Sequence, residues 1–147
     1  MHIPVQVDYG VRALIDIAEH QSVGSVQTSK IAQRKSIPEA YLARLMLTLQ
    51  RNGIVKSQRG PRGGHLLAMP PSDISMGMVM NSLGGTQTLV NCLDHTGACD
   101  QALKCSQRDI WREVDEAIQS ILDSTSIADL VYRITQAEEK VWQAARR

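Results

Sequence analysis

Apolar residues recur at helical spacing through the first part of the chain. Between Val5 and His20 they fall on one face of a helix, at Val7, Val11, Leu14, Ile15 and Ala18. Pro4 suits the first turn of that helix, and Gly24-Ser25 interrupts the pattern. A short second helix is predicted at 28–34, where apolar residues again face inward.

A third helix is predicted to end near Arg51, with an apolar face made by Leu42, Leu45, Met46 and Leu49. Ser36 and Glu39 have the spacing of a capping box, and Pro38 falls in the first turn, where its missing N–H does no harm. The dipeptide Asn52-Gly53 predicts a left-handed cap at the carboxyl end of this helix.

The pattern then changes from a helical period to a strand period. Residues 54–58 and 65–69 read as two short strands, and the glycine-rich segment 59–64 reads as the turn between them. Three helices followed by a hairpin is the layout of a winged helix-turn-helix. The predicted fold class is therefore mainly α, with a small β-hairpin wing.

The carboxyl-terminal half predicts three more helices. A short apolar helix spans 76–83, and Ser106 and Asp109 can cap a long helix whose apolar stripe is Ile110, Trp111, Val114, Ala117, Ile118, Ile121 and Leu122. A last helix from about Ser126 places Leu130, Val131, Ile134 and Val141 on one side. We interpret the long stripe as a dimerisation helix; the alternative is that it folds back on its own domain. The predicted parts are 1–84, a cysteine loop at 85–106, and 107–147.

The composition is that of a folded protein, with 43% hydrophobic and 21% charged residues. The chain contains no run of about 18 apolar residues, so no membrane span is expected. The segment MHIPVQVDYG lacks a basic region followed by an apolar stretch, so it does not read as a signal peptide. We therefore expect a cytoplasmic protein, in a compartment where thiols stay reduced.

Basic residues are concentrated in the predicted winged domain. The segment 28–65 holds eight basic residues and one acidic residue, a net charge of +7, although the whole chain carries only +1. This block favours double-stranded DNA as a partner over a merely solvated face, because it coincides with the winged-helix layout. The predicted DNA contacts are Thr28, Glu39, Ala40, Tyr41, Ala43, Arg44, Arg59 and Arg62.

An enzymatic function is not favoured by the same segment. GPRGG could be read as a phosphate-cradling loop, but no helix is predicted after it and no Lys-Ser/Thr pair follows. Cys92 and His95 could form a nucleophile and base, yet no pocket or oxyanion donor can be inferred for them. We therefore predict that the chain is not an enzyme.

All three cysteines of the chain fall between Cys92 and Cys105. Their odd number argues against a disulfide framework. Thiolates are the normal ligands of iron–sulfur clusters, which take four protein ligands, so Cys92, Cys99 and Cys105 would need one more. Two alternatives stay open: a Cys3His zinc site using His95, and a metal-free loop whose thiols respond to oxidants.

The stretches DYGVRALIDIA and SKIAQRKSIPEAYLARLMLTLQRNGIVKSQRGPRGGHLL, together with the cysteine loop, resemble the Rrf-type family of bacterial regulators, the IscR/NsrR-like winged-helix transcription factors. The resemblance runs from about Val5 to Val131. It implies a winged helix with a long dimerisation helix, homodimers that bind DNA, and DNA reading by the third helix and Arg59. It also implies an iron–sulfur cluster on Cys92, Cys99 and Cys105 that controls operator binding.

The resemblance proposes a fourth cluster ligand as well. In the nitric-oxide-sensing branch an aspartate at the position of Asp8 completes a four-iron cluster from the partner subunit, with His95 as the other candidate here. A four-iron cluster is therefore favoured and a two-iron cluster is possible. Asp8 could instead cap the first helix or pair with Arg12.

This sequence departs from the family pattern in four places. Arg62 and His65 replace a usual Gly and Tyr of the wing, and Ala40 and Ala43 are short where some relatives have polar residues. Six residues separate the first two cysteines instead of five. The two-iron members have a histidine ligand where this chain has Arg108. Some members also act through an enzyme partner, so a protein partner is a second hypothesis.

Overall fold

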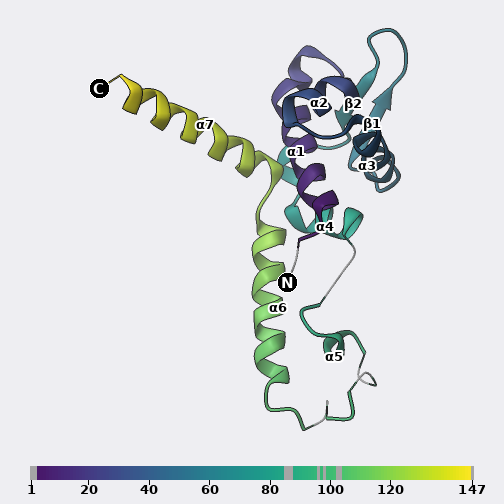
Figure 1. Ribbon diagram of the computed structural model, residues 1–147, viewed down its shortest axis with the longest axis vertical. Helices are drawn as coiled ribbons and strands as arrows, with labels where there is room; N and C mark the ends of the chain where they lie inside the picture. Colours follow the sequence, from purple (N-terminus) through teal and green to yellow (C-terminus); the bar gives the residue numbers. More distant parts are fainter. Residues whose placement is uncertain (1–2, 85–87, 96, 98, 102–103, 147) are drawn as a thin grey trace.

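The computed structural model describes residues 3–84, 88–95, 97, 99–101 and 104–146. Its elements are α1 (Val5–His20), η1 (Gln21–Val23), α2 (Thr28–Lys35), α3 (Glu39–Arg51), β1 (Val55–Gln58), β2 (Gly64–Leu67), η2 (Pro71–Asp73), α4 (Met76–Leu83), α5 (Asn91–Asp94), α6 (Arg108–Ser124) and α7 (Ile127–Ala145). Figure 1 shows α1 to α4 and the hairpin gathered together, while α6 and α7 leave this group in different directions. Within these residues, no helix combines the length and hydropathy needed to cross a membrane.

Three helices and a hairpin form the winged helix-turn-helix that the sequence predicts. The helices predicted at 5–20 and 28–34 are observed at Val5–His20 and Thr28–Lys35. β1 and β2 pair antiparallel, with Val55 opposite Leu67 and Gln58 opposite Gly64. The predicted fold class, mainly α with a small hairpin wing, is confirmed.

The core lies where α1 meets α2, α3, α4 and α7. Its largest fully buried side chains are aliphatic, including Leu14, Ile17, Ile31, Leu42, Leu49, Ile54, Ile74 and Ile127. Gly10 lets α4 approach α1 closely, because a Cβ at this position would collide with the side chain of Leu83. The chain has no phenylalanine, and Leu, Ile and Val side chains make up most of this core.

The turn between α2 and α3 differs from the predicted capping box. Ser36 adopts the left-handed conformation, with φ +53°, and its N–H donates to the carbonyl of Ala32 at the end of α2. Pro38 is the residue before the first turn of α3, and no side chain caps that helix. Ser36 therefore ends α2 and does not begin α3, so the predicted pairing with Glu39 is wrong. The predicted end of α3 is confirmed, since Gly53 has φ +73° and its N–H donates to Gln50.

α6 is an amphipathic helix without a buried residue. Four large apolar side chains on it are 39–64% exposed, namely Ile110, Trp111, Val114 and Ile121. The residue before its first turn is Gln107, which makes no side-chain cap, so the predicted cap by Ser106 or Asp109 is wrong. Asp109 instead forms an ion pair with Arg112 at 3.2 Å.

α7 folds back on the winged domain over its first half. Ser126 and Asp129 form a capping box at its start, and the hydrogen bonds from Ser126 lower the pKa of Asp129. Ile127 is fully buried in the core, and the predicted apolar face of α7 packs against it through Leu130, Val131 and Ile134. Farther along, Val141 and Trp142 are 70% and 60% exposed. The fold-back alternative concerned the stripe of α6, and it stays a prediction together with the division into 1–84, 85–106 and 107–147.

An ion pair between a buried carboxylate and a partly exposed arginine joins α1 to α2. The carboxylate of Asp16 is fully buried, and Arg34 donates to it from Nε at 2.8 Å and from Nη2 at 2.6 Å. This two-point geometry is the strongest that an arginine and a carboxylate can form, and the hydrogen bond raises the pKa of Arg34. Lys35 lies 4.0 Å from the same carboxylate and 3.3 Å from Glu19. The pair fixes α2 on α1, and therefore also places α3.

We predict that Asp16→Ala lowers the free energy of unfolding of the metal-free protein by about 1.5–3 kcal/mol, because it removes the charge-assisted hydrogen bonds that hold α2 on α1. The matched control is Asp8→Ala, which removes an exposed ion pair from the same helix and should cost less than about 1 kcal/mol. Urea denaturation followed by circular dichroism measures both. Equal costs for the two variants would contradict the assignment of Asp16 as the anchor of α2.

Candidate nucleic-acid interface and cysteine loop

Five of the eight residues predicted to contact DNA lie in the first turns of α3, and four of these five are exposed. Glu39, Ala40, Ala43 and Arg44 are exposed. Tyr41 differs, because its ring is half-buried and packs edge-to-face on Tyr9 of α1, with 5.8 Å between ring centroids and 85° between ring planes. The exposed strip of α3 is therefore made of short side chains flanked by one acidic and one basic residue.

The tip of the hairpin is a tight turn that carries two exposed arginines, Arg59 and Arg62. Gly60 has φ +111°, a conformation that favours glycine, and its carbonyl accepts from the N–H of Gly63 at 2.9 Å. A Cβ at Gly63 would lie 2.5 Å from the carbonyl oxygen of Gln58. These glycines keep the turn narrow. Arg59 and Arg62 carry the longest side chains in this turn.

The hairpin is tied to the segment before α2 by both backbone and side-chain hydrogen bonds. Val26 and His65 exchange backbone hydrogen bonds of 2.9 and 2.8 Å. Ser25 Oγ donates to the carbonyl of Arg62 at 2.6 Å. The hydroxyl of Thr28, a predicted DNA contact, lies 2.9 Å from His65 Nε2 and is half-buried. Thr28 thus braces the wing from the start of α2.

His65 is the central residue of this polar network. Its Nδ1 lies 3.4 Å from Ser57 Oγ, which donates to Gln50 Oε1 at 2.8 Å. A neutral imidazole with its proton on Nδ1 satisfies the whole chain, because Thr28 then donates to Nε2. Burial lowers the pKa of His65, which favours this neutral form. The sequence marked His65 only as a replacement for a usual tyrosine, and its bracing role depends on contacts that no local pattern reveals.

A basic cavity of about 360 Å³ lies between η1, the start of α2 and the hairpin. It is lined by His20, Ser25, Lys30, Arg34, Arg62 and Gly63, among others. No acidic residue lines it in the described part of the chain. Its charge suits a phosphate group, in keeping with the basic block of 28–65. The sequence singled out Arg62 but not Lys30 for such contacts.

The cysteine loop is docked beside α6 through α5. Cys92 lies in α5 and is half-buried, Cys105 is half-buried just before α6, and Cys99 is exposed between them. All three are free thiols. Among the described residues, no three of the predicted ligands (these cysteines, Asp8 and His95) have their ligand atoms within 4.8 Å of one another. Segments 85–87, 96, 98 and 102–103 of the predicted loop lie outside the described residues.

Asp8 occupies the first turns of α1 and does not meet the cysteines of its own chain. It pairs with Arg12 at 2.8 Å, which is one of the predicted alternatives, whereas the residue before α1 is Pro4, so Asp8 is not its cap. Figure 1 shows α5 beside the far half of α6, away from α1. Within one chain, Asp8 and the loop are therefore separate, and His95 is an exposed residue of the loop.

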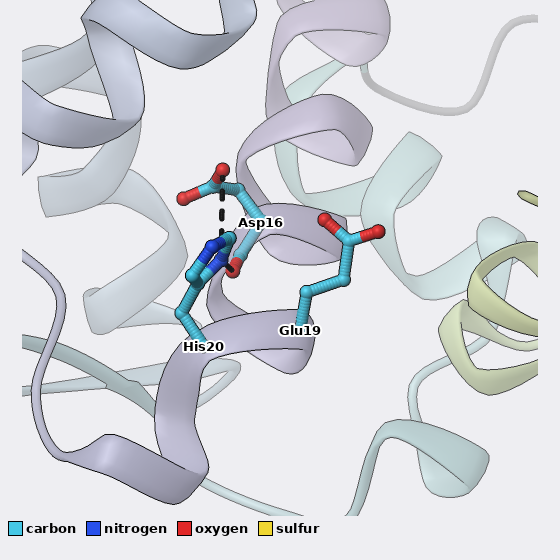
Figure 2. A group of neighbouring side chains, drawn as sticks. All are labelled: Asp16, Glu19 and His20. Atoms are coloured by element: carbon cyan, nitrogen blue, oxygen red, sulfur yellow. Dashed lines mark hydrogen bonds and ion pairs between the residues drawn. The ribbon is translucent and has the colours of Figure 1, made fainter. Parts of the chain in front are cut away.

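Asp16, Glu19 and His20 are the one group of three metal-ligand side chains gathered among the described residues, and Figure 2 shows them on the last turns of α1. Both oxygens of Asp16 already accept from Arg34, and Glu19 pairs with Lys35. His20 Nδ1 lies 2.8 Å from the backbone oxygen of Asp16. Arg34 and Lys35 neutralise the two carboxylates without a metal ion. We therefore assign the group to the α1–α2 ion-pair network.

The hairpin directly after three helices defines a winged helix-turn-helix protein. The family described as "Rrf2: Iron-dependent Transcriptional regulator" matches residues 3–133. The chain therefore belongs to the Rrf2 family, as the sequence motifs indicated.

Relatives by sequence and by structure agree on this class. The chain is 35% identical to the HTH-type transcriptional regulator IscR of Yersinia pseudotuberculosis over 123 residues, which is 84% of this chain and 74% of that protein. It is similar to the structure of CymR, the global cysteine regulator of B. subtilis, with TM-score 0.78 and 30% identity over 90% of this chain and 98% of that one. IscR of T. potens gives TM-score 0.76 and 31% identity, with 93% and 90% covered. The chain is thus a transcriptional regulator of the IscR and CymR type and not an enzyme.

The bracing role of His65 predicts a pH-dependent stability. Because burial lowers the pKa of His65 in the folded protein below its ordinary 6.5, the unfolded chain binds the proton first as the pH falls. Stability should be lost as the pH drops through 6.5 toward the folded-state pKa, and His65→Gln should lose less over that range. Urea denaturation of both proteins, from about pH 8 to about pH 5, measures the difference. A constant difference across the whole range would contradict this origin.

Proposed function

We propose that this regulator binds double-stranded DNA as a homodimer and that the cysteine loop controls the binding through an iron–sulfur cluster. The observation that carries the DNA-binding proposal is the placement of the basic block. The segment 28–65, with its net charge of +7, makes up α2, α3 and the wing. In the described part of the chain, Arg44, Arg59 and Arg62 have no acidic ion-pair partner within 4.0 Å. They are therefore available to phosphates.

We assign different parts of the DNA contact to α3 and to the wing. In this class the second helix of the helix-turn-helix enters the major groove with its amino-terminal residues. That helix is α3, and we assign base contacts to its exposed positions Glu39, Ala40, Ala43 and Arg44. Arg59 and Arg62 then contact phosphates or a neighbouring groove, and Lys30 adds charge beside Arg62 in the basic cavity. Thr28 and Tyr41 contribute by holding the wing and α3 in place.

The homodimer proposal is supported by α6. Its exposed stripe of Ile110, Trp111, Val114 and Ile121 has the spacing of a coiled-coil seam. A second copy would cover this stripe with the same surface, as two-fold interfaces do. Two recognition helices related by that symmetry would read two half-sites of an operator.

The cysteine loop offers a donor set that suits iron. Three thiols from one segment provide three of the four ligands that iron–sulfur clusters take, and Asp8 of the second subunit is the favoured fourth ligand, with His95 as the alternative. When bound, such a cluster supplies a redox-active centre that reacts with oxidants or nitric oxide. The role of the chain's own residues is to hold the loop against α6, so that a change in the loop reaches the dimer helix. We propose a four-iron cluster, with two-iron as the alternative.

A second candidate function is control by thiol oxidation without a metal. Cys99 is exposed, and one solved relative, at 25% identity and TM-score 0.71, is an oxidized form of Staphylococcus aureus CymR. In this alternative the loop changes when its thiols are oxidised, and a protein partner provides a further route to control.

We predict that Arg59→Ala and Arg62→Ala each weaken DNA binding about three- to tenfold at moderate salt, and that each lowers the slope of log affinity against log salt by about one. The probe is a duplex selected by the wild-type protein from random sequences, measured by fluorescence anisotropy at several salt concentrations. Arg112→Ala is the matched control, because this arginine lies on α6 and pairs with Asp109. Losses of the same size in all three variants would argue against the wing as the DNA contact.

We predict that protein isolated without oxygen has a broad visible absorption band, with iron and sulfide in equal amounts and about four irons per subunit. Cys99→Ala should lose the band and the dependence of DNA binding on iron, while Ser106→Ala, next to the last cysteine, should keep both. A colourless protein that cannot be reconstituted, or one that holds zinc, would overturn the cluster and favour the thiol alternative. A Cys99→Ala variant that binds operator identically with and without iron would also overturn it.

A further inference from the structure

Arg108, the first residue of α6, contacts the backbone of two of the three cysteines. Its side-chain Nη2 donates to the carbonyl of Cys92 at 3.3 Å. Its backbone N–H donates to the carbonyl of Cys105, also at 3.3 Å. One half-buried residue therefore joins the first and the last cysteine of the loop to the start of the dimer helix.

A second donor of the Arg108 side chain, its Nε–H, is without an acceptor among the described residues. The Nε atom is buried. In a planar guanidinium, Nε–H and one Nη2–H point in parallel from the same edge. The free Nε–H therefore belongs to the same rigid plane as the Nη2 that contacts the Cys92 carbonyl. A buried donor without an acceptor is unfavourable, so a group bound there that offers an acceptor would be favoured.

A second tie shows that this contact is part of a docked interface. The backbone N–H of Leu89 donates to Asp115 Oδ1 at 3.2 Å. Asp115 lies seven residues after Arg108, so the two side chains lie on one face of α6, two turns apart. The segment that leads into Cys92 is thus fastened to α6 at both positions, and α5 lies beside the amino-terminal half of α6 (Figure 1).

We propose that Arg108 is a positioning residue of the cysteine loop. It holds Cys92 and Cys105 at the start of α6, and it would offer a free N–H and a permanent positive charge to the group that the cysteines bind. The identity of that group rests on the iron–sulfur proposal above. Hydrogen bonds to sulfur and net charge set the reduction potential of such groups, so Arg108 favours the reduced, more negative state.

The first test uses the metal-free chain of 147 residues and does not depend on any cluster. Hydrogen exchange is measured by mass spectrometry on peptides covering 88–95 in the wild type and in Arg108→Ala, Arg108→Lys and Arg112→Ala. Arg108→Ala should exchange about tenfold faster in this segment, because a charge-assisted hydrogen bond is lost. Arg112, one turn along α6, pairs with Asp109 and should leave the exchange unchanged. Equal exchange in Arg108→Ala and Arg112→Ala would overturn the positioning role.

The second test uses the same proteins after anaerobic assembly of the cluster. Arg108→Ala should lower the midpoint potential and release iron to a chelator faster, and Arg108→Lys should fall between it and the wild type, because lysine keeps the charge but loses the planar pair of donors. A purely structural role would change the exchange but not the potential, and that result would overturn the donor role. A wild type that assembles no cluster would overturn the donor role together with the iron–sulfur proposal, while the exchange measurement still decides the positioning role.

Discussion

The burial of α1 is the constraint on which the rest of the structure depends. This helix contacts α2, α3, α4 and the first half of α7, and its Ala13, Leu14 and Ile17 are fully buried. Gly10 gives α4 its close approach, and Asp16 fixes α2 through Arg34. The orientation of the DNA-facing helix and the origin of the carboxyl-terminal helix are therefore set by the same element. A shift of α1 would therefore change the positions of both α3 and the first half of α7.

The part of the chain that carries the cysteines is held together differently. α6 has no buried residue, and it is joined to the cysteine loop by hydrogen bonds in which Arg108 donates and Asp115 accepts. Segments held by a few hydrogen bonds open at lower free energy than segments held by a packed core. A loop of this kind can respond to chemistry at its thiols without unfolding the winged domain. The apolar stripe of α6 is exposed in the single chain, and the proposed dimer rests on that exposure.

The sequence predicted what depends on local periodicity, and missed what depends on contacts between distant residues. The helices at 5–20 and 28–34 and the hairpin follow from spacing and turn residues, and all are observed. Ser36 was misread because its left-handed backbone serves the preceding helix. Tyr41 was read as exposed because its partner Tyr9 is 32 positions away. The ion pair of Asp16 and the contacts of Arg108 likewise join residues whose pairing no short pattern encodes. For the candidate site, sequence located the cysteines and the wing arginines, whereas the bracing network around His65 required the fold.

The wing is held to the body of the domain by Ser25, Val26 and Thr28 before any DNA arrives. A brace of this kind removes most of the conformational freedom that a free hairpin would lose on binding. It also limits how far the wing can be reshaped to suit each operator, which shifts part of the adjustment to the duplex. We therefore expect this regulator to discriminate operators partly by groove width and flexibility at positions it never touches, which is recognition of DNA mechanics and not of base edges alone.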